Sequence, residues 1–237
     1  MWSYYGAKTN IIHLYPPPKY GRIIEPFAGT ARYSLLYWDR DILLVDKYEV
    51  IVKIWKWLQQ CSKDDVLRLP RKVTTKQSIN DFTFDCEEAR LLFSFLLGQG
   101  AERPRNHASP RVVQRQNFIN FSLIRISEQL HKIRHWDIRL GSYDELMNEE
   151  ATWFIDPPYQ YGGQSYVKSN RHIDFKYLAE WCRYRKGQVI VCENTKADWM
   201  DFKPMIAQMG SRYTTIEAIW CNYPTSFDVI QQDLFNP

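Results

Sequence analysis

The segment GRIIEPFAGTARYSLLYWDRDILLVD, residues 21–46, decides the fold. Its first five residues predict a strand that runs into a tight turn, PFAGT. Ala31 to Trp38 predict a helix, with Leu35 and Leu36 as its apolar anchors. The run ILLVD then predicts a buried strand that ends in Asp46. Strand, turn, helix and strand in this order are typical of the first unit of a doubly wound α/β sheet.

The alternation continues only briefly beyond this segment. Residues 50–58 predict a second helix, and the chain up to residue 139 favours helices around irregular, basic loops. Strands are expected again at 138–140, 152–156, 188–192 and 215–220, with a last one at 227–230. We therefore predict a Rossmann-like α/β core, residues 1–57 and 138–237, that is interrupted by a mainly helical lobe, residues 58–137. Near the N-terminus, residues 8–14 predict a short helix that the prolines at 16–18 end.

The composition is that of a folded globular protein. Of the 237 residues, 45% are hydrophobic, 15% aromatic and 24% charged, which excludes a disordered chain. No apolar run reaches the roughly 18 residues of a membrane span. The five cysteines are scattered, which favours reduced thiols and a cytoplasmic protein. Neither they nor the histidines have the spacing or neighbours of metal ligands, so we expect no metal site.

Asp46 and the turn before the first helix form a candidate cofactor crevice. Small residues in the turn let a ligand approach the backbone, the helix N-terminus offers free N–H groups, and a carboxylate at the end of the next strand can accept both ribose hydroxyls. Gly29 and Asp46 are 17 positions apart, near the spacing of about 20 in nucleotide-binding folds. The turn has a single glycine, which argues against a dinucleotide. An ordinary strand-to-helix turn is the alternative interpretation.

The sequence Asp156-Pro157-Pro158-Tyr159 follows an apolar strand directly and predicts a target-base site. An exocyclic amine on a nucleobase is a poor nucleophile, because its lone pair is delocalised into the ring. The Asp156 carboxylate can accept one N–H and the Pro157 carbonyl the other, and consecutive prolines stiffen the backbone that aims them. Tyr159 offers a face on which a flipped base can stack. The alternative is a strand followed by a polyproline turn.

The two sites and their order resemble those of the Dam-like DNA adenine-N6 methyltransferases (D12 class). Residues 4–8, YYGAK, are similar to the family's N-terminal motif, and residues 24–30, IEPFAGT, to its main cofactor motif. Asp46 matches the acidic residue of the second strand, and residues 156–159 match the catalytic motif. The resemblance does not extend to the middle of the chain, from Asp46 to about residue 140.

This resemblance implies S-adenosyl-L-methionine as cofactor and an adenine in double-stranded DNA as target, either in a restriction-modification pair or as an orphan methylase. It favours a bacterial or phage-encoded protein. It implies cofactor contacts for Tyr4, Lys8, Glu25, Phe27, Gly29, Asp46 and Asp156. Lys8 would face the methionine carboxylate, and Phe27 would lie near the adenine of the cofactor.

Two positions depart from the family pattern. Ala31 stands where the family usually has a second glycine, which adds only a methyl group. Gly141-Ser142-Tyr143 stands where it usually has Gly-Asp-Phe, so Ser142 removes a carboxylate near the cofactor adenine and is expected to weaken affinity. Neither departure touches the groups proposed to hold the target base.

The predicted lobe concentrates the positive charge of the chain. Residues 103–139 hold eight basic and two acidic residues, against a net charge of +4 for the whole protein. Such a concentration is typical of a surface that binds phosphate. The loop at residues 101–120 also carries amides able to read adenine edges: Asn106, Gln114, Gln116, Asn117 and Asn120. A second stretch, residues 160–171, could close over the site. The DNA contacts expected from both are Arg103, Arg105, Arg111, Arg115, Lys168 and Arg171. A solvated basic loop is the alternative.

Three other functions fit the same motifs. Methylation of cytosine at N4 needs the same acceptors as methylation of adenine at N6, and an RNA could take the place of DNA. A non-catalytic DNA-binding protein that retains the methyltransferase fold is a rival from a different class. The departures at Ala31 and Ser142 favour this rival, whereas the intact sequence at 156–159 argues against it.

Overall fold

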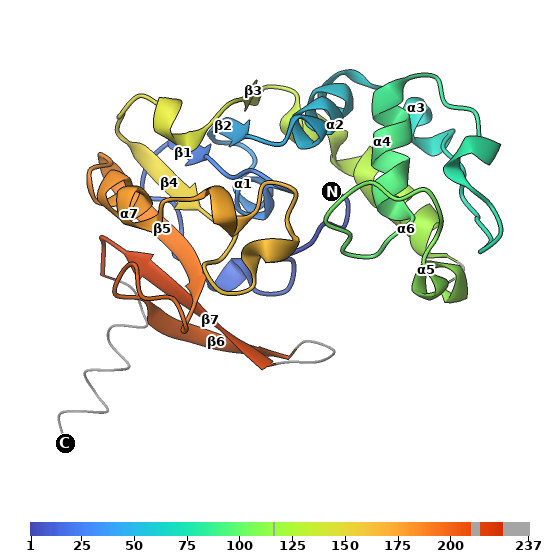
Figure 1. The fold of residues 1–237 in the computed structure, drawn as a ribbon. Helices are drawn as coiled ribbons and strands as arrows, with labels where there is room; N and C mark the ends of the chain where they lie inside the picture. The colour runs from blue at the N-terminus through green and yellow to red at the C-terminus, as the bar shows by residue number, and fades with distance from the viewer. Residues whose placement is uncertain (116, 210–213, 225–237) are drawn as a thin grey trace.

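The computed structural model describes residues 1–115, 117–209 and 214–224, so the strand predicted at 227–230 lies outside the described residues. The described chain forms a seven-stranded sheet in the order β3-β2-β1-β4-β5-β7-β6 (Figure 1). The strands are β1 (Arg22–Glu25), β2 (Asp41–Asp46), β3 (Asp137–Leu140), β4 (Ala151–Ile155), β5 (Gly187–Asn194), β6 (Lys203–Met209) and β7 (Thr214–Cys221). All pairings among β1 to β5 are parallel, whereas β7 runs antiparallel to both β5 and β6. This is the predicted Rossmann-like α/β sheet.

Helices cover the sheet and form a second part beside it (Figure 1). They are α1 (Arg32–Leu36), α2 (Glu49–Gln60), α3 (Lys63–Leu67), α4 (Glu87–Leu96), α5 (Pro110–Gln114), α6 (Phe118–Gln129) and α7 (Phe175–Arg183). Short 3-10 turns are η1 (Ile12–Leu14), η2 (Ile79–Asp81), η3 (Leu130–Ile133), η4 (Tyr143–Glu145), η5 (Gly163–Ser165) and η6 (Asn170–His172). The segment from α3 to α6 follows α2 and precedes β3. This segment, the helical part of the protein, lies to one side of the sheet.

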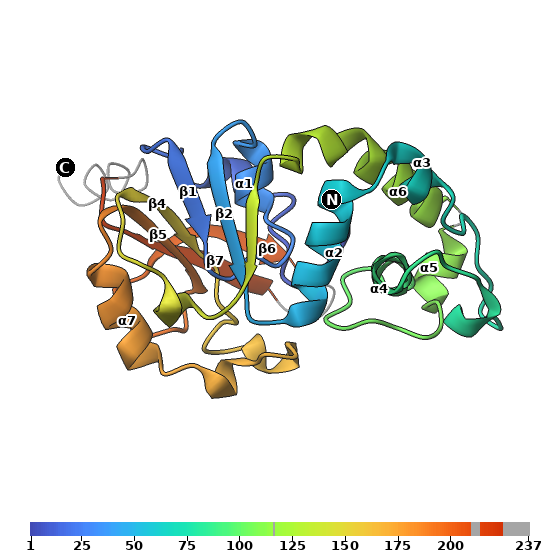
Figure 2. The ribbon, with the colours of Figure 1, turned by 90° about the horizontal axis from the view of Figure 1, so that it is seen from above.

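The sheet buries apolar side chains on both faces, because successive residues of a strand point to opposite sides. Ile23 and Leu44 belong to the core that α1, α2 and the helical part share, and Ile24 and Val45 to the core under α7. Figure 2 shows α1 and α7 on opposite faces of the sheet. Parallel strands covered in this way expose their carboxyl ends at one edge, and β1 pairs with both β2 and β4. The ligand crevice of a doubly wound sheet forms at such a point, where the strand order reverses.

Two sequence expectations about local structure are wrong, and one strand was not expected. Residues 8–14 do not form a helix: a turn at Lys8 leads into the 3-10 turn η1. Helix α1 spans only five residues and buries Tyr33 and Ser34. Of its two expected anchors, Leu35 packs against the core, whereas Leu36 is 45% exposed. Strand β6 was not expected, because Pro204 interrupts its apolar pattern. Proline is tolerated at the edge of a sheet, and the register of β6 against β7 shifts between Pro204 and Ile206.

Within the described ranges, every helix is too short or too polar to cross a membrane. The same residues contain no group of three or more His, Cys, Asp or Glu side chains arranged to hold a metal ion. Cys61, Cys182 and Cys192 are buried thiols, and Cys86 is a partly buried one.

Candidate functional site

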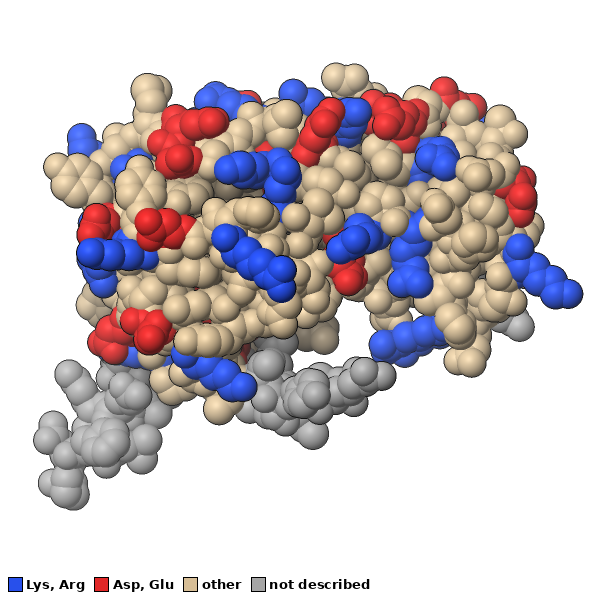
Figure 3. Space-filling view, viewed as in Figure 1, with Lys and Arg blue, Asp and Glu red and all other residues tan. Residues whose placement is uncertain are grey.

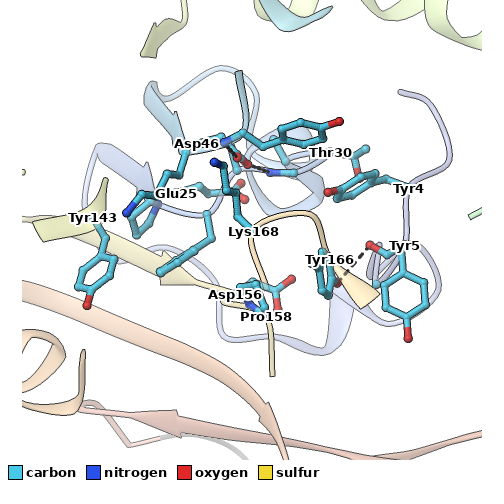
Figure 4. Close-up of a pocket in the computed structure, with 18 of the residues that line it drawn as sticks. Tyr4, Tyr5, Glu25, Thr30, Asp46, Tyr143, Asp156, Pro158, Tyr166 and Lys168 are labelled. Atoms are coloured by element: carbon cyan, nitrogen blue, oxygen red, sulfur yellow. Dashed lines mark hydrogen bonds between the residues drawn. The ribbon is translucent and has the colours of Figure 1, made fainter. Parts of the chain in front are cut away.

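A cavity of about 350 Å³ opens at the carboxyl ends of β1, β2 and β4. In Figure 4, Asp46, Glu25 and Asp156 lie between Tyr143 at one end and Tyr4 and Tyr166 at the other. The walls include most residues that the sequence assigns to a cofactor or target site: Tyr4, Lys8, Glu25, Phe27, Gly29, Asp46, Asp156, Pro158 and Lys168. Pro157 and Tyr159 are absent from the walls; Pro157 is buried and Tyr159 partly buried behind them. Segments far apart in the chain therefore meet at one site.

Asp46 joins β2 to the turn after β1. Its two carboxylate oxygens accept hydrogen bonds from the backbone N–H of Gly29 (2.9 Å) and of Tyr48 (2.8 Å). Burial raises the pKa of Asp46 to about 6, although these two N–H donors oppose the rise. Gly29 has a positive φ of 46°, which favours glycine, and a Cβ there would lie 3.6 Å from the Tyr4 ring. The turn is thus held against the carboxylate, and the remaining lone pairs of Asp46 can accept hydroxyl groups.

Aromatic rings line the end of the cavity beside β3. Phe27 stacks on Tyr143 with ring centroids 5.4 Å apart, and Tyr143 packs edge-on against Trp181 of α7. Burial raises the pKa of the Tyr143 phenol to about 12, so this ring stays neutral. An apolar slot of this kind suits a planar heterocycle.

Glu25 ends β1 below the cavity. It is fully buried, and its Oε1 accepts the backbone N–H of Ser34 at 2.7 Å. Burial raises its pKa to about 8, against the opposing effect of that hydrogen bond. Glu25 therefore carries a proton at neutral pH and connects the end of β1 to the first turn of α1.

Ala31 does more than add a methyl group. It adopts the left-handed conformation, φ 45° and ψ 51°, at the N-terminus of α1, and its side chain is buried. It is the single non-glycine residue with positive φ in the described part of the chain. An L-residue in this conformation costs about 1–2 kcal/mol. A glycine at this position would avoid that strain.

Lys8 lies between two carboxylates at the end of β4. Its Nζ is 2.9 Å from Asp156 Oδ1 and 3.3 Å from Glu217 Oε1, and its side chain is only 7% exposed. Burial opposes the charge of Lys8, but Asp156 and Glu217 prevail and hold its pKa above the usual value. Burial raises the pKa of Asp156, and the nearby Lys8 opposes this effect. The ammonium of Lys8 is thus engaged with side chains of the protein.

Glu217, on β7, is a site residue that sequence reasoning missed. Its Oε1 also accepts hydrogen bonds from the hydroxyls of Tyr15 (2.5 Å) and Tyr159. Lys8 Nζ lies 4.6 Å from the centre of the Tyr159 ring and covers one face of it. The signal in the sequence was a carboxylate inside an apolar strand, between Ile216 and Ala218.

The departure at Ser142 has a carboxylate beside it. The Ser142 backbone N–H donates to Glu145 Oε2 at 3.1 Å, in a capping box that begins η4. Glu145 Oε2 would also lie 2.9 Å from a Cβ at Gly141. Position 142 lacks a carboxylate, but Glu145, three residues further along the chain, places one beside it.

The segment after Tyr159, residues 160–173, contributes part of the cavity wall. Its start is tied to β5, because the backbone N–H of Gln160 donates to Glu193 and Asn194 Nδ2 donates to the Tyr161 carbonyl at 2.8 Å. Further on, the Tyr166 hydroxyl donates to the Tyr5 carbonyl at 3.2 Å. A Cβ at Gly6 would collide with that hydroxyl, so the glycine of the N-terminal motif makes room for it.

The six cations predicted to bind DNA are all exposed, and they come from two separate segments of the chain. Arg103 and Arg105 lie on the loop before α5, Arg111 is in α5, and Arg115 donates to Gln99 Oε1 at 3.2 Å. Lys168 lines the cavity itself. Figure 3 shows Lys and Arg over both parts of this face, interspersed with Asp and Glu.

Two other cations of the segment 103–139 are engaged in contacts within the protein. One amide of the segment lies outside the described residues. Arg134 donates to the carbonyls of Gln59 and Cys61, and Arg139 pairs with Asp137. Gln116 is not among the residues that the structure describes. The charge available to a partner is therefore smaller than the sequence count suggests.

Comparisons with known proteins give distant structural likenesses and no sequence family. No protein-family model matches the chain, and no curated protein matches it. Among solved structures, it is similar to the rRNA methyltransferase AviRa from Streptomyces viridochromogenes, with 11% sequence identity and a TM-score of 0.34. The match covers 84% of this chain and 76% of that chain. We base the functional proposal on the cavity itself.

Proposed function

We propose that this protein transfers a methyl group from S-adenosyl-L-methionine to the N6 amine of an adenine in double-stranded DNA, after the base flips out of the helix. One observation carries the proposal. Asp156 and Pro158, which follow β4, lie in the wall of the same cavity as Asp46 and the Phe27–Tyr143 stack. A carboxylate for a base amine and a crevice for a nucleoside thus share one enclosed space.

The chemistry of the residues present fits S-adenosyl-L-methionine. The stacked rings of Phe27 and Tyr143 suit its adenine, and Asp46 suits its ribose hydroxyls. Lys8, Asp156 and Glu217 form a buried group with two carboxylates and one ammonium, which suits a positively charged sulfonium. When bound, the cofactor supplies a methyl carbon that is activated by this sulfonium.

The groups at the end of β4 orient the attacking amine. Asp156, in the cavity wall, accepts one N–H of the amine, so electron density returns to the nitrogen. The second acceptor expected from the sequence, the Pro157 carbonyl, belongs to a residue outside that wall. The nitrogen lone pair forms the new bond to the methyl carbon while the carbon–sulfur bond breaks and its electron pair stays on sulfur. The methylated amine is acidic and loses its proton to solvent afterwards, so Asp156 does not have to be a strong base.

The exposed arginines support DNA as the substrate. Arg103, Arg105, Arg111 and Arg115 lie near one another in the chain, next to the amides of Asn106 and Gln114. Such cations bind phosphate, and amides can read the edges of adenine. A base of such DNA has to flip out of the helix to enter the cavity, which is the usual route by which enzymes modify a base.

The test is transfer of a radiolabelled methyl group from the cofactor to DNA from an unmethylated host. The DNA is then digested to nucleosides and the labelled product identified by chromatography. We expect N6-methyladenine. Label in N4-methylcytosine would reassign the target base, and label only in an added RNA would reassign the polymer. Cofactor binding without transfer to either polymer would favour the non-catalytic DNA-binding protein.

A further inference from the structure

Arg32, the first residue of α1, belongs to the wall of the cavity. In the described part of the chain its guanidinium forms no ion pair and makes one hydrogen bond, from Nη2 to the Trp2 carbonyl at 2.6 Å. Its Nε is buried, and no described residue accepts a hydrogen bond from it. An unpaired cation that is partly withdrawn from water is destabilising. Arg32 is therefore a candidate for binding an anion that enters the cavity.

The surroundings of Arg32 favour a negatively charged ligand. Burial and the nearby cation Arg125, on α6, lower the pKa of Arg32 to about 10. The guanidinium thus keeps its charge at neutral pH, and the neighbour that acts on it repels it. An anion in the cavity would relieve both the loss of solvent and this repulsion.

The place of Arg32 in the cavity fits the methionine end of the cofactor. Its Nη2 is bonded to the carbonyl of Trp2, two residues before Tyr4. Figure 4 shows Tyr143 and Tyr4 at opposite ends of the cavity, with Asp46 between them. A cofactor that has its adenine beside Tyr143 and its ribose at Asp46 extends its amino-acid part toward the end where Tyr4 and Arg32 lie.

Lys8, to which the resemblance assigns the methionine carboxylate, is engaged elsewhere. Its Nζ is 2.9 Å from Asp156 Oδ1 and 3.3 Å from Glu217 Oε1. A carboxylate of the ligand would have to compete with both side chains for the same ammonium. At Arg32, no carboxylate of a described residue competes in this way.

We propose that Arg32, and not Lys8, binds the carboxylate of the cofactor's methionine. A guanidinium presents its N–H groups as a planar fork that matches both oxygens of a carboxylate. The hydrogen bond to the Trp2 carbonyl holds the side chain at the wall before the ligand arrives. This inference rests on the proposed function, since it names the residue that holds one part of the proposed cofactor.

The experiment is calorimetric titration of the full-length protein with S-adenosylmethionine and, separately, with decarboxylated S-adenosylmethionine. The second ligand keeps the adenine, ribose, sulfonium and amine but has a hydrogen in place of the carboxylate. We expect the affinity of Arg32→Met for S-adenosylmethionine to fall by about 10- to 100-fold, as the loss of charge-assisted hydrogen bonds predicts, while its affinity for the decarboxylated ligand stays within about twofold of wild type. A purely structural role of Arg32 would weaken both ligands by the same factor.

Two further variants separate charge from packing. Arg32→Gln keeps an N–H donor for the Trp2 carbonyl but loses the charge, so it should also lose the preference for the ligand with a carboxylate. Arg40→Met changes an exposed arginine outside the cavity and should leave both affinities unchanged. Thermal unfolding of each variant reports whether it is folded. If Arg32→Met does not fold, Arg32→Gln decides the matter, since an unchanged preference in that variant overturns the proposal.

Failure of this inference is distinguishable from failure of the proposed function. If the wild-type protein binds the cofactor and methylates DNA, but Arg32→Met binds both ligands like wild type or loses both equally, only the role of Arg32 is overturned. The same holds if the wild-type protein binds both ligands equally well. If the wild-type protein binds neither ligand, both proposals are overturned.

Discussion

The strand ends and the helical part of this protein use charged residues in opposite ways. At the ends of β1, β2 and β4, Glu25, Asp46 and Asp156 are enclosed by protein, and burial raises the pKa of each. In the helical part, Arg111 and Arg115 lie in water. Charge–charge interactions are strong in a buried site and weak where solvent and salt screen them. Single replacements should therefore have large effects at the strand ends, and the arginines should act mainly as a sum.

The largest effect is expected from Asp156→Ala. This carboxylate is the proposed acceptor for the target amine, so the variant should lose methyl transfer to DNA while it stays folded. Radiolabelled methyl transfer measures the activity, and Asp201→Ala, an exposed carboxylate outside the cavity, is the matched control. More than a tenth of wild-type activity in folded Asp156→Ala would remove Asp156 from the mechanism.

The second effect is a pH dependence of stability that originates at Glu25. Burial raises its pKa from 4.5 to about 8, so between these values the folded state holds a proton that the unfolded state has released. Its contribution to the free energy of unfolding is fully present below pH 4.5 and is lost as pH rises through about 8. Glu25→Gln is always neutral. The free energy of unfolding of Glu25→Gln, relative to that of wild type, should therefore rise by about 3–5 kcal/mol from pH 4 to pH 9.

Urea unfolding at several pH values measures this difference. Glu180→Gln changes an exposed glutamate on α7 and serves as the control. A difference between Glu25→Gln and wild type that stays constant with pH would mean that Glu25 is charged in the folded protein.

A smaller effect is expected from Asp46→Ala, which should weaken S-adenosylmethionine binding by about 1.5–3 kcal/mol, as the loss of a charged acceptor predicts. The variant also leaves the N–H groups of Gly29 and Tyr48 without this acceptor. Asp46→Asn keeps one acceptor oxygen but removes the charge. It therefore separates the effect of the lost charge from the effect of the lost hydrogen bonds to the turn. Calorimetry that shows unchanged affinity in both variants would reject the ribose role.

The exposed cations should give a weaker and salt-dependent effect. Each neutralised phosphate releases counterions, so replacing Arg105, Arg111 or Arg115 with alanine should lower the salt slope of DNA binding by about one for each phosphate that is no longer neutralised. If an arginine reads a guanine edge instead, a loss of about 1–3 kcal/mol should appear only on the preferred sequence. Anisotropy titrations at several salt concentrations measure both, with Arg183→Ala on α7 as control.

A triple alanine variant that binds and methylates DNA like wild type would exclude this surface. The DNA contacts would then be sought around Lys168, Arg171 and Lys176.

The smallest effect concerns the left-handed residue at the start of α1. Ala31→Gly removes strain of about 1–2 kcal/mol, but the glycine gains entropy in the unfolded state. We expect a net rise of about 0.5–1 kcal/mol in the free energy of unfolding. Ala28→Gly changes a buried alanine of the same turn that lacks a positive φ, and should lower stability. A loss of stability in Ala31→Gly would show that packing of the Ala31 methyl group stabilises the fold by more than the backbone strain destabilises it.

Much of the fold was readable in the sequence, because strands of a covered sheet must be apolar. Strands β1 to β5 and β7 lie at or within a few residues of the predicted runs. Strand β6 was missed because Pro204 is compatible only with an edge position, and no local pattern says which strand is at the edge. Helix α1 was expected to be longer because its apolar residues do not reveal that the chain turns away after Leu36.

The sequence by itself determined which carboxylates end strands: Glu25, Asp46 and Asp156 each lie at the end of an apolar run, and the carboxyl ends of parallel strands share one edge. Only the tertiary structure decided what each carboxylate meets. It brings Lys8 to Asp156 across 148 positions. It also puts Glu217 against Tyr15 across 202 positions, because β7 enters the sheet in reverse beside β5. Such neighbours depend on strand order and burial, which are properties of the whole packed sheet and of no local stretch of chain.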